Sequence, residues 1–169
     1  MADDGRGSRG RDGAPLAAGG LHGRYVSFPD PPPTLEDTGG SSFKDVSGTV
    51  LPGISKWAFS IGGEYAHQQS VFGRTGQWFA AIDTSYRSSF SSSSSYSKYL
   101  VVDGYSLLHA RIGFRAGGGW AVFLWSRNLL DKNYFELMTA APGNTGLYVG
   151  QPGDRRTVGV TLRLSLGTR

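Results

Sequence analysis

The last strand-forming segment, residues 157–166, alternates apolar and polar residues with almost no exception. Because side chains on a β-strand point to opposite faces in turn, this segment predicts a strand with one apolar and one polar face. Such a strand fits a soluble β-sandwich with its apolar face inward, or a transmembrane β-barrel with that face toward lipid. In a barrel, the residues expected to face lipid are Val158, Val160, Leu162, Leu164 and Leu166.

The composition of the chain favours strands and turns. Hydrophobic residues make up 38% of it, less than the roughly 45–50% of a packed globular domain, and its 26 glycines are about twice the average share. No long segment has the 3.6-residue apolar spacing of an amphipathic helix, and no apolar run is long enough for a transmembrane helix. The absence of cysteine excludes a disulfide framework and a thiolate metal site. We therefore expect an all-β chain.

Alternating segments separated by turn residues predict six to seven antiparallel strands. Residues 1–20 are small, charged and rich in glycine, so we expect them to be disordered; residues 1–13 also lack the apolar core of a secretory signal. Residues 34–53 are expected to form a long polar loop. The expected strands lie at residues 21–28, 57–65, 78–86, 105–115, 120–130, 147–149 and 157–166.

The connections between these strands alternate in length, which favours a membrane barrel. Membrane barrels have short turns at one rim and long loops at the other, whereas a Greek-key sandwich need not alternate in this way. The long connections are 29–53, 88–103 and 136–146, and the short ones are 73–76, 117–119 and 150–154.

Aromatic residues bracket several of the expected strands. An aromatic at each end of an apolar band is typical of the girdles at two membrane interfaces. The other interpretation is that Trp and Tyr simply favour strands. The bracketing pairs are Trp57 and Tyr65, Trp78 and Tyr86, and Trp120 and Tyr134.

If the apolar face meets lipid, the polar face lines a lumen. The candidate lumen-facing residues are Glu64, Asp83, Arg87 and Arg111, which we expect to pair across neighbouring strands. The functional interpretation of the same residues is contact with an anionic ligand that passes through the lumen.

No pattern in the chain indicates catalysis. His22, His67 and His109 lie in separate segments without metal-ligand spacing, and the serine-rich segment 88–97 has no Ser/His/Asp arrangement. The glycines at 117–119 are not followed by the Lys and Ser/Thr of a phosphate loop. The net charge of +4 gathers near the two ends and forms no basic face interleaved with aromatics, so nucleic-acid binding is not expected. We expect no enzyme activity, no cofactor and no metal site.

Two motifs near the end of the chain carry a family resemblance. Residues 127–135 read Arg-Asn-Leu-Leu-Asp-Lys-Asn-Tyr-Phe, and residues 146–160 contain Gly-Gln-Pro-Gly-Asp-Arg-Arg-Thr. Together they resemble the carboxy-terminal signature of TonB-dependent outer-membrane receptors, and the resemblance covers roughly residues 24–166. Their physical role is to hold turns, since Asn and Asp side chains bond local backbone and Pro-Gly sets a turn. The residues that match the family pattern are Asn128, Leu129, Asp131, Tyr134, Gly150, Pro152 and Gly153.

The resemblance implies a fold, a location and a function. Residues 21–169 would be the carboxy-terminal portion of an antiparallel up-and-down transmembrane β-barrel in the outer membrane of a Gram-negative bacterium. The function implied is uptake of ferric siderophores or similar ligands. The implied partners are outer-membrane lipid, the barrel-assembly machinery, the remaining plug and barrel of the receptor, and TonB for a full-length receptor.

The chain departs from the family pattern in three respects. The family has a plug followed by a 22-stranded barrel, and this chain carries only about six to seven strands, so we expect an incomplete, truncated barrel that is inactive alone. The family's last strand ends on an aromatic residue, where this chain has Leu166. Residues 1–20 lack the alternation of a preceding strand and are expected to be non-native to the receptor.

Two other classes of protein stay open at this point. One is a small, complete outer-membrane barrel with a structural or adhesive role. The other is a soluble β-sandwich binding module, which would bury Trp57, Phe59, Leu162 and Leu164 in one dry core. The sequence does not name the ligand.

Overall fold

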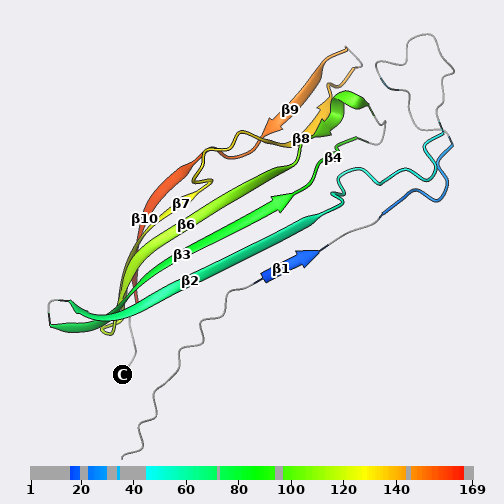
Figure 1. Ribbon diagram of the computed structural model, residues 1–169. Helices are drawn as coiled ribbons and strands as arrows, with labels where there is room; N and C mark the ends of the chain where they lie inside the picture. The colour runs from blue at the N-terminus through cyan, green and yellow to red at the C-terminus, as the bar shows by residue number, and fades with distance from the viewer. Residues whose placement is uncertain are drawn as a thin grey trace, which may run out of the picture.

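The chain folds into one large antiparallel sheet with two small sheets at one of its ends (Figure 1). The computed structural model describes residues 16–19, 23–29, 34, 45–71, 73–93, 97–143 and 146–165. Within them, the only regular structure besides strands is one turn of 3-10 helix, η1 (Lys98–Leu100). The all-β prediction is therefore confirmed.

The large sheet, here called the main sheet, has six strands in the order β1-β2-β3-β6-β7-β10. Every neighbouring pair is antiparallel. The strands are β1 (Leu16–Gly19), β2 (Ala58–Val71), β3 (Arg74–Arg87), β6 (Tyr105–Ala116), β7 (Trp120–Arg127) and β10 (Thr157–Leu164).

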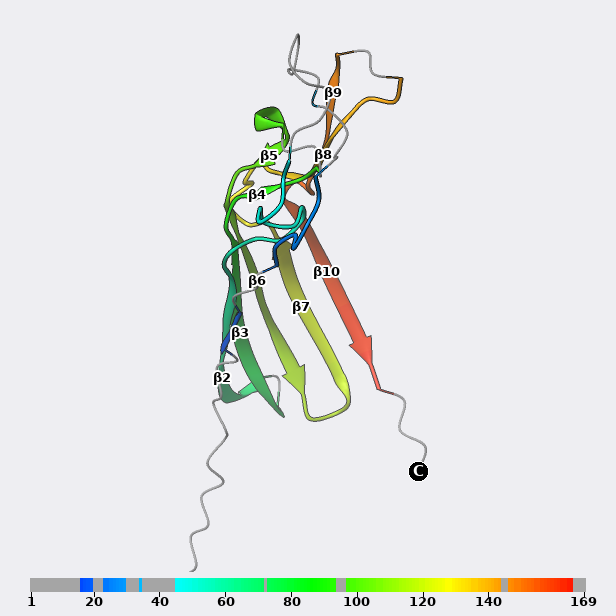
Figure 2. The same ribbon diagram turned by 90° about the vertical axis from the view of Figure 1, so that its right-hand side faces the viewer.

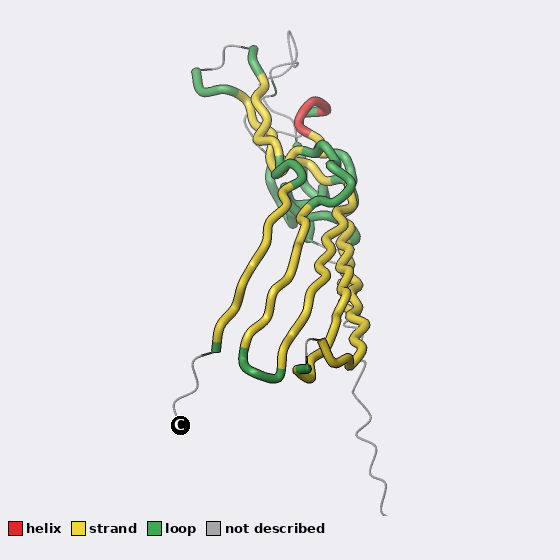
Figure 3. Tube along the Cα trace, turned by 90° about the vertical axis from the view of Figure 1, so that its left-hand side faces the viewer, coloured by secondary structure: helices red, strands yellow, loops and turns green. Residues whose placement is uncertain are grey.

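The two ends of the main sheet differ in character (Figures 2 and 3). At one end, here called the turn end, β2–β3 and β6–β7 are joined by tight turns, and Gly73 and Gly119 have φ of +74° and +83°. Positive φ is costly for residues with a Cβ, so glycine suits both turns. At the other end, here called the loop end, β4 (Phe90–Ser91) pairs with β5 (Val101–Val102), and β8 (Phe135–Ala140) pairs with β9 (Tyr148–Pro152).

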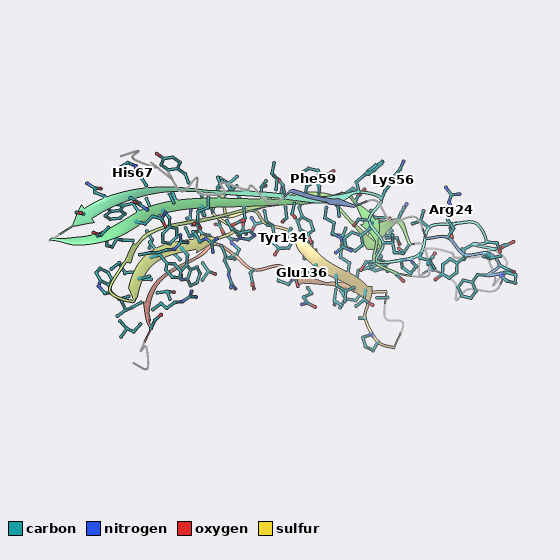
Figure 4. The ribbon with its side chains drawn as sticks, turned by 90° about the horizontal axis from the view of Figure 1, so that it is seen from below. Arg24, Lys56, Phe59, His67, Tyr134 and Glu136 are labelled. Carbon is teal, nitrogen blue, oxygen red and sulfur yellow. The ribbon has the colours of Figure 1, made fainter. Side chains whose placement is uncertain are left out.

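The main sheet is curved and has two chemically different faces. Figure 4 shows Phe59 and His67 on the side of β2 that faces away from β7 and β10; this convex side is here called the outer face, and the opposite side the inner face. Among the described residues, β10 pairs only with β7 and β1 only with β2, so the sheet is open at both edges. Closure into a barrel is therefore not observed.

The best-buried apolar side chains gather at the loop end, beneath the long connections. Val46, Leu100 and Val102 are each no more than 2% exposed, and Phe90 lies beneath the guanidinium of Arg87 at 3.7 Å. Val46 lies within the predicted polar loop at 34–53, where its backbone N–H donates to the carbonyl of Phe28 at 3.2 Å. The long connections at this rim therefore bury apolar side chains of their own.

Several predicted boundaries were wrong. Strand β1 falls inside the segment predicted to be disordered, because residues 16–19 pair with the edge that β2 offers at Ala58–Ile61; residues 1–15 and 20 lie outside the described residues. The strand expected at 21–28 is reduced to one bridge between Arg24 and Val50. The loop expected at 136–146 begins instead as β8, because β9 supplies a pairing partner.

Candidate functional site

The outer face presents an apolar surface that no other part of the described chain covers. The residues of β10 expected to face lipid are Val158, Val160, Leu162 and Leu164, and their exposed fractions are 59%, 70%, 63% and 64%. The fifth, Leu166, lies outside the described residues. The register aligns Val160 with Leu124 of β7, and Leu124 with Ile112 of β6, so the apolar surface continues across the sheet.

Aromatic clusters close this apolar surface at both ends. At the turn end, Phe114 lies between Trp78 and Trp120, with ring centroids 5.3 and 5.7 Å apart. At the loop end, Phe59 stacks on Tyr86 at 5.0 Å. Trp78 and Tyr86 belong to the same strand, and the nine residues from 78 to 86 match the length that a tilted strand needs to cross a bilayer.

The inner face carries a charged network centred on Glu64. Its carboxylate accepts two hydrogen bonds from Arg115, at 2.6 and 3.0 Å, and a longer one from Arg111 at 3.5 Å. Arg115 also covers the ring of Phe79, with 3.8 Å from its guanidinium carbon to the ring centroid. The sequence predicted the pairing of Glu64 with Arg111 but not the stronger partner Arg115, although alternation places Arg115 on the same face.

The other two candidate lumen residues do not join this network. Asp83 lies on the inner face opposite His109, and it forms no ion pair among the described residues. Arg87 instead donates to the Oγ of Ser55 and to the carbonyl of Gly53, both at 2.6 Å. Arg87 therefore holds the segment that leads into β2, and it does not pair with a carboxylate across the sheet.

A hollow of about 630 Å³ lies on the inner face beside these groups. It is open on one side, and cationic side chains outnumber acidic ones around it. Aromatic rings form part of its floor, since Trp125 lies over Gly159 and donates to the Oγ1 of Thr161 at 3.0 Å. The lining includes Asp83, His109, Arg111, Phe123, Trp125, Arg127 and Arg163.

The two motifs that carry the family resemblance contact each other at the loop end. The contacts between residues 128–134 and residues 150–156 are here called the rim clasp. Asn128 is 3% exposed, and its amide nitrogen donates to the carbonyls of Lys132 and Asp154, each at 2.9 Å. Its amide oxygen accepts from the backbone of Lys132 at 2.8 Å. Asn128 has a φ of +46°, a conformation that Asn tolerates better than most residues.

Asp131 supplies the charged half of the rim clasp. Its carboxylate accepts two parallel hydrogen bonds from Arg155, at 3.0 and 2.8 Å, and one from the backbone of Arg156 at 3.0 Å. The bonds from Arg155 are the main reason why the pKa of Asp131 falls from its ordinary 3.8 to about 2. The same contact raises the pKa of Arg155.

Tyr134 packs the two turns together. Its carbonyl accepts a hydrogen bond from the backbone of Gly153 at 2.9 Å, and a Cβ on Gly153 would lie only 2.0 Å from its ring. The ring also packs against Tyr105 of β6 in a tilted arrangement, with centroids 4.4 Å apart. Gly150 plays the same role toward Phe135, whose ring would be 2.7 Å from an added Cβ. The motif glycines are therefore required for close contact with aromatic rings.

The sequence indicated the motif residues but not what they bind. Asn128 and Asp131 were expected to bond their local backbone, and Asn128 does so at Lys132. The contacts from Asn128 to Asp154 and from Asp131 to Arg155 were missed. The sequence feature that could have indicated these contacts is the acidic Asp154 followed by the basic pair at 155–156. Such a combination is common in polar turns and does not identify a partner.

The described residues contain no set of three metal-ligating side chains close enough to hold an ion. His67 and His109 lie on different strands and on opposite faces. His109 instead accepts a hydrogen bond at Nδ1 from the backbone of Asn128 at 3.3 Å. His22 lies outside the described residues.

No helix in the described part of the chain is long and apolar enough to cross a membrane. The chain matches no family model, no curated protein and no solved structure.

Proposed function

We propose that this chain forms part of the wall of a transmembrane β-barrel of the TonB-dependent receptor type, in the outer membrane of a Gram-negative bacterium. Its function there is the uptake of ferric siderophores or similar ligands. The observation that carries the proposal is the pair of contrasting faces: an exposed apolar face bounded by aromatic clusters, and an inner face with charged side chains. In water, such an uncovered apolar face would favour aggregation, whereas a bilayer covers it.

The exposure of the outer face argues against a soluble β-sandwich. A sandwich would bury four apolar residues of the outer face, yet none of them is buried, and among the described residues no second sheet lies against them. Their exposed fractions are 58% for Trp57, 46% for Phe59, 63% for Leu162 and 64% for Leu164.

The rim clasp supports the family assignment. Of the residues that match the receptor pattern, Tyr134 and Gly153 bond each other across the β8–β9 hairpin, and Asn128 and Asp131 bond the neighbouring residues Asp154 and Arg155. The two halves of the pattern meet where β10 begins to pair with β7. The partners proposed on this basis are outer-membrane lipid, the barrel-assembly machinery, the plug and remaining barrel strands of a receptor, and TonB.

The inner face supports an anionic ligand. Arg111, Arg127 and Arg163 line the hollow there, and Asp83 is its only acidic lining residue within the described chain. A basic wall raises the local concentration of anions, such as a ferric chelate with carboxylate or catecholate groups. Binding of radiolabelled ferric siderophores to membranes with and without the protein tests this ligand class.

The placement in a membrane is tested with single cysteines, since the chain contains none. Arg111 and Ile112 are neighbours on β6, and both residues are exposed in the chain alone. In outer-membrane vesicles, Arg111→Cys should react with a water-soluble maleimide, and Ile112→Cys should react only after the bilayer is dissolved. Equal reaction of both variants in intact vesicles would contradict the proposal.

A further inference from the structure

The outer face is interrupted by a groove, although most of its residues are bulky. The register aligns Ile82, Ala110, Ser126 and Val158 in one row across β3, β6, β7 and β10. Small side chains at Ala110 and Ser126 leave a hollow of about 750 Å³, which also extends over Leu124 and Ala80. The groove has a mainly apolar lining and extends toward the loop end, where Leu129 and Arg156 line it.

A positively charged side chain, that of Arg156, lies at the loop end of this groove. Arg156 lines the groove two positions before Val158, and its guanidinium makes one long hydrogen bond, to the carbonyl of Leu129 at 3.5 Å. It forms no ion pair within the described chain. The nearby carboxylate of Asp131 is already bound by Arg155 in a two-bond contact. The positive charge of Arg156 is therefore available to a ligand.

The groove lining also contains a hydroxyl, that of Ser126, without a hydrogen-bond partner among the described residues. Ser126 is 9% exposed, and its hydroxyl makes no hydrogen bond to any described residue. The hydroxyl oxygen is closed to solvent in the chain alone, so a ligand reaches it only after the side chain turns toward the groove. Two strand positions separate the level of Ser126 from that of Arg156, which corresponds to about 7 Å along a strand.

We propose that this groove binds one membrane lipid with an anionic phosphate headgroup. This inference rests on the proposed placement of the outer face in a bilayer. The phosphate binds the guanidinium of Arg156, a contact that suits the planar donors of arginine. The ester region, a few bonds from the phosphate, lies over Ser126, whose small side chain leaves room for it. The acyl chain lies over Ala110 and Ala80 and fills the apolar part of the groove.

The test measures the selectivity of the 169-residue chain for spin-labelled lipids in phosphatidylcholine vesicles. Electron paramagnetic resonance gives the motionally restricted fraction for spin-labelled phosphatidylglycerol and for spin-labelled phosphatidylcholine. We expect the protein to prefer phosphatidylglycerol, and Arg156→Gln to lower that preference about five-fold. Lys56→Gln removes the same charge near the same end of the sheet but away from the groove, and should leave the preference unchanged.

A second pair of variants tests the apolar part of the groove. Ala110→Phe places a ring in the groove and should reduce the restricted fraction of phosphatidylglycerol. Val122→Phe adds a ring to the same face outside the groove lining and should not. Equal preference in the wild type and in Arg156→Gln would overturn the lipid site.

The outcomes separate this inference from the proposed function. If the protein inserts into vesicles and restricts both lipids equally, the lipid site is contradicted but the proposed place in a membrane barrel is not. If the protein does not insert, and its cysteine variants at 111 and 112 react equally, both the lipid site and the proposed function are contradicted.

Discussion

The side-chain amide of Asn128 donates a hydrogen bond to the backbone carbonyl of Asp154 at 2.9 Å, although 26 positions separate the two residues along the chain. This bond joins the end of β7 to the start of β10, on either side of the β8–β9 hairpin. Because Asn128 is buried and makes three side-chain hydrogen bonds, it is the centre of the rim clasp.

Replacing Asn128 should destabilise the protein strongly. Asn128→Ala removes three hydrogen bonds and places a Cβ-bearing residue with no compensating side-chain bond at positive φ, so we expect a loss of about 3 kcal/mol in the free energy of unfolding. Asn128→Gly loses the same bonds but accepts the backbone conformation, and should be less damaging by about 1 kcal/mol. Urea unfolding in detergent micelles measures both. Equal stability of Asn128→Ala and the wild type would show that the rim clasp does not contribute to folding.

The rim clasp should weaken in acid. The pKa of Asp131 is about 2 in the folded protein and 3.8 ordinarily, so the folded state favours the ionised carboxylate. Its contribution is complete above about pH 4 and is lost as the pH falls through 2. The urea midpoint of the wild type should fall over this range more than that of Asp131→Asn, which cannot ionise. Parallel pH profiles of the two proteins would contradict this assignment.

Gly153 should not tolerate a side chain while Tyr134 is present. An added Cβ would lie 2.0 Å from the ring of Tyr134, so Gly153→Ala must displace that ring from its contact with Tyr105. We expect a cost of about 1–3 kcal/mol, as for other overpacked sites. In a Tyr134→Ala background the same substitution should cost much less. Additive effects of the two substitutions would mean that the ring and the glycine do not compete for space.

A charge should be tolerated on one face of the main sheet and not on the other. Ile82 and Asp83 are neighbours near the middle of β3, on the outer and inner faces respectively. If the outer face meets lipid, Ile82→Arg should lower the free energy of unfolding in a bilayer by about 2–4 kcal/mol. Asp83→Arg should have a much smaller effect, because its side chain meets water. Similar losses for both variants would argue against a lipid-facing outer surface.

The long strands of the main sheet were predictable from sequence because alternation is a local property. The segments expected at 105–115 and 157–166 became β6 and β10 with small changes at their ends. Alternation also assigned Val158 and Val160 to one face together. These predictions needed no knowledge of the strand's neighbours.

The elements that the sequence missed depend on partners far away in the chain. Residues 16–19 have no alternation and form a strand only because β2 presents a free edge to them. Arg155 has many possible partners in a polar turn, and its choice of Asp131 follows from the way β10 returns to β7. The groove beside Ala110 required the register of four strands, which no single segment contains.

The order of strands in the main sheet also bears on how the protein folds. β2 with β3, and β6 with β7, form local hairpins, whereas β10 reaches β7 only after the chain has passed through residues 128–156. Closing so long a loop costs conformational entropy before any strand pairing repays it, and such non-local contacts slow folding. The Asn128–Asp154 contact closes that loop at its base. Once it has formed, the first residues of β10 are already beside the last residues of β7, and the remaining ladder can form residue by residue toward the turn end.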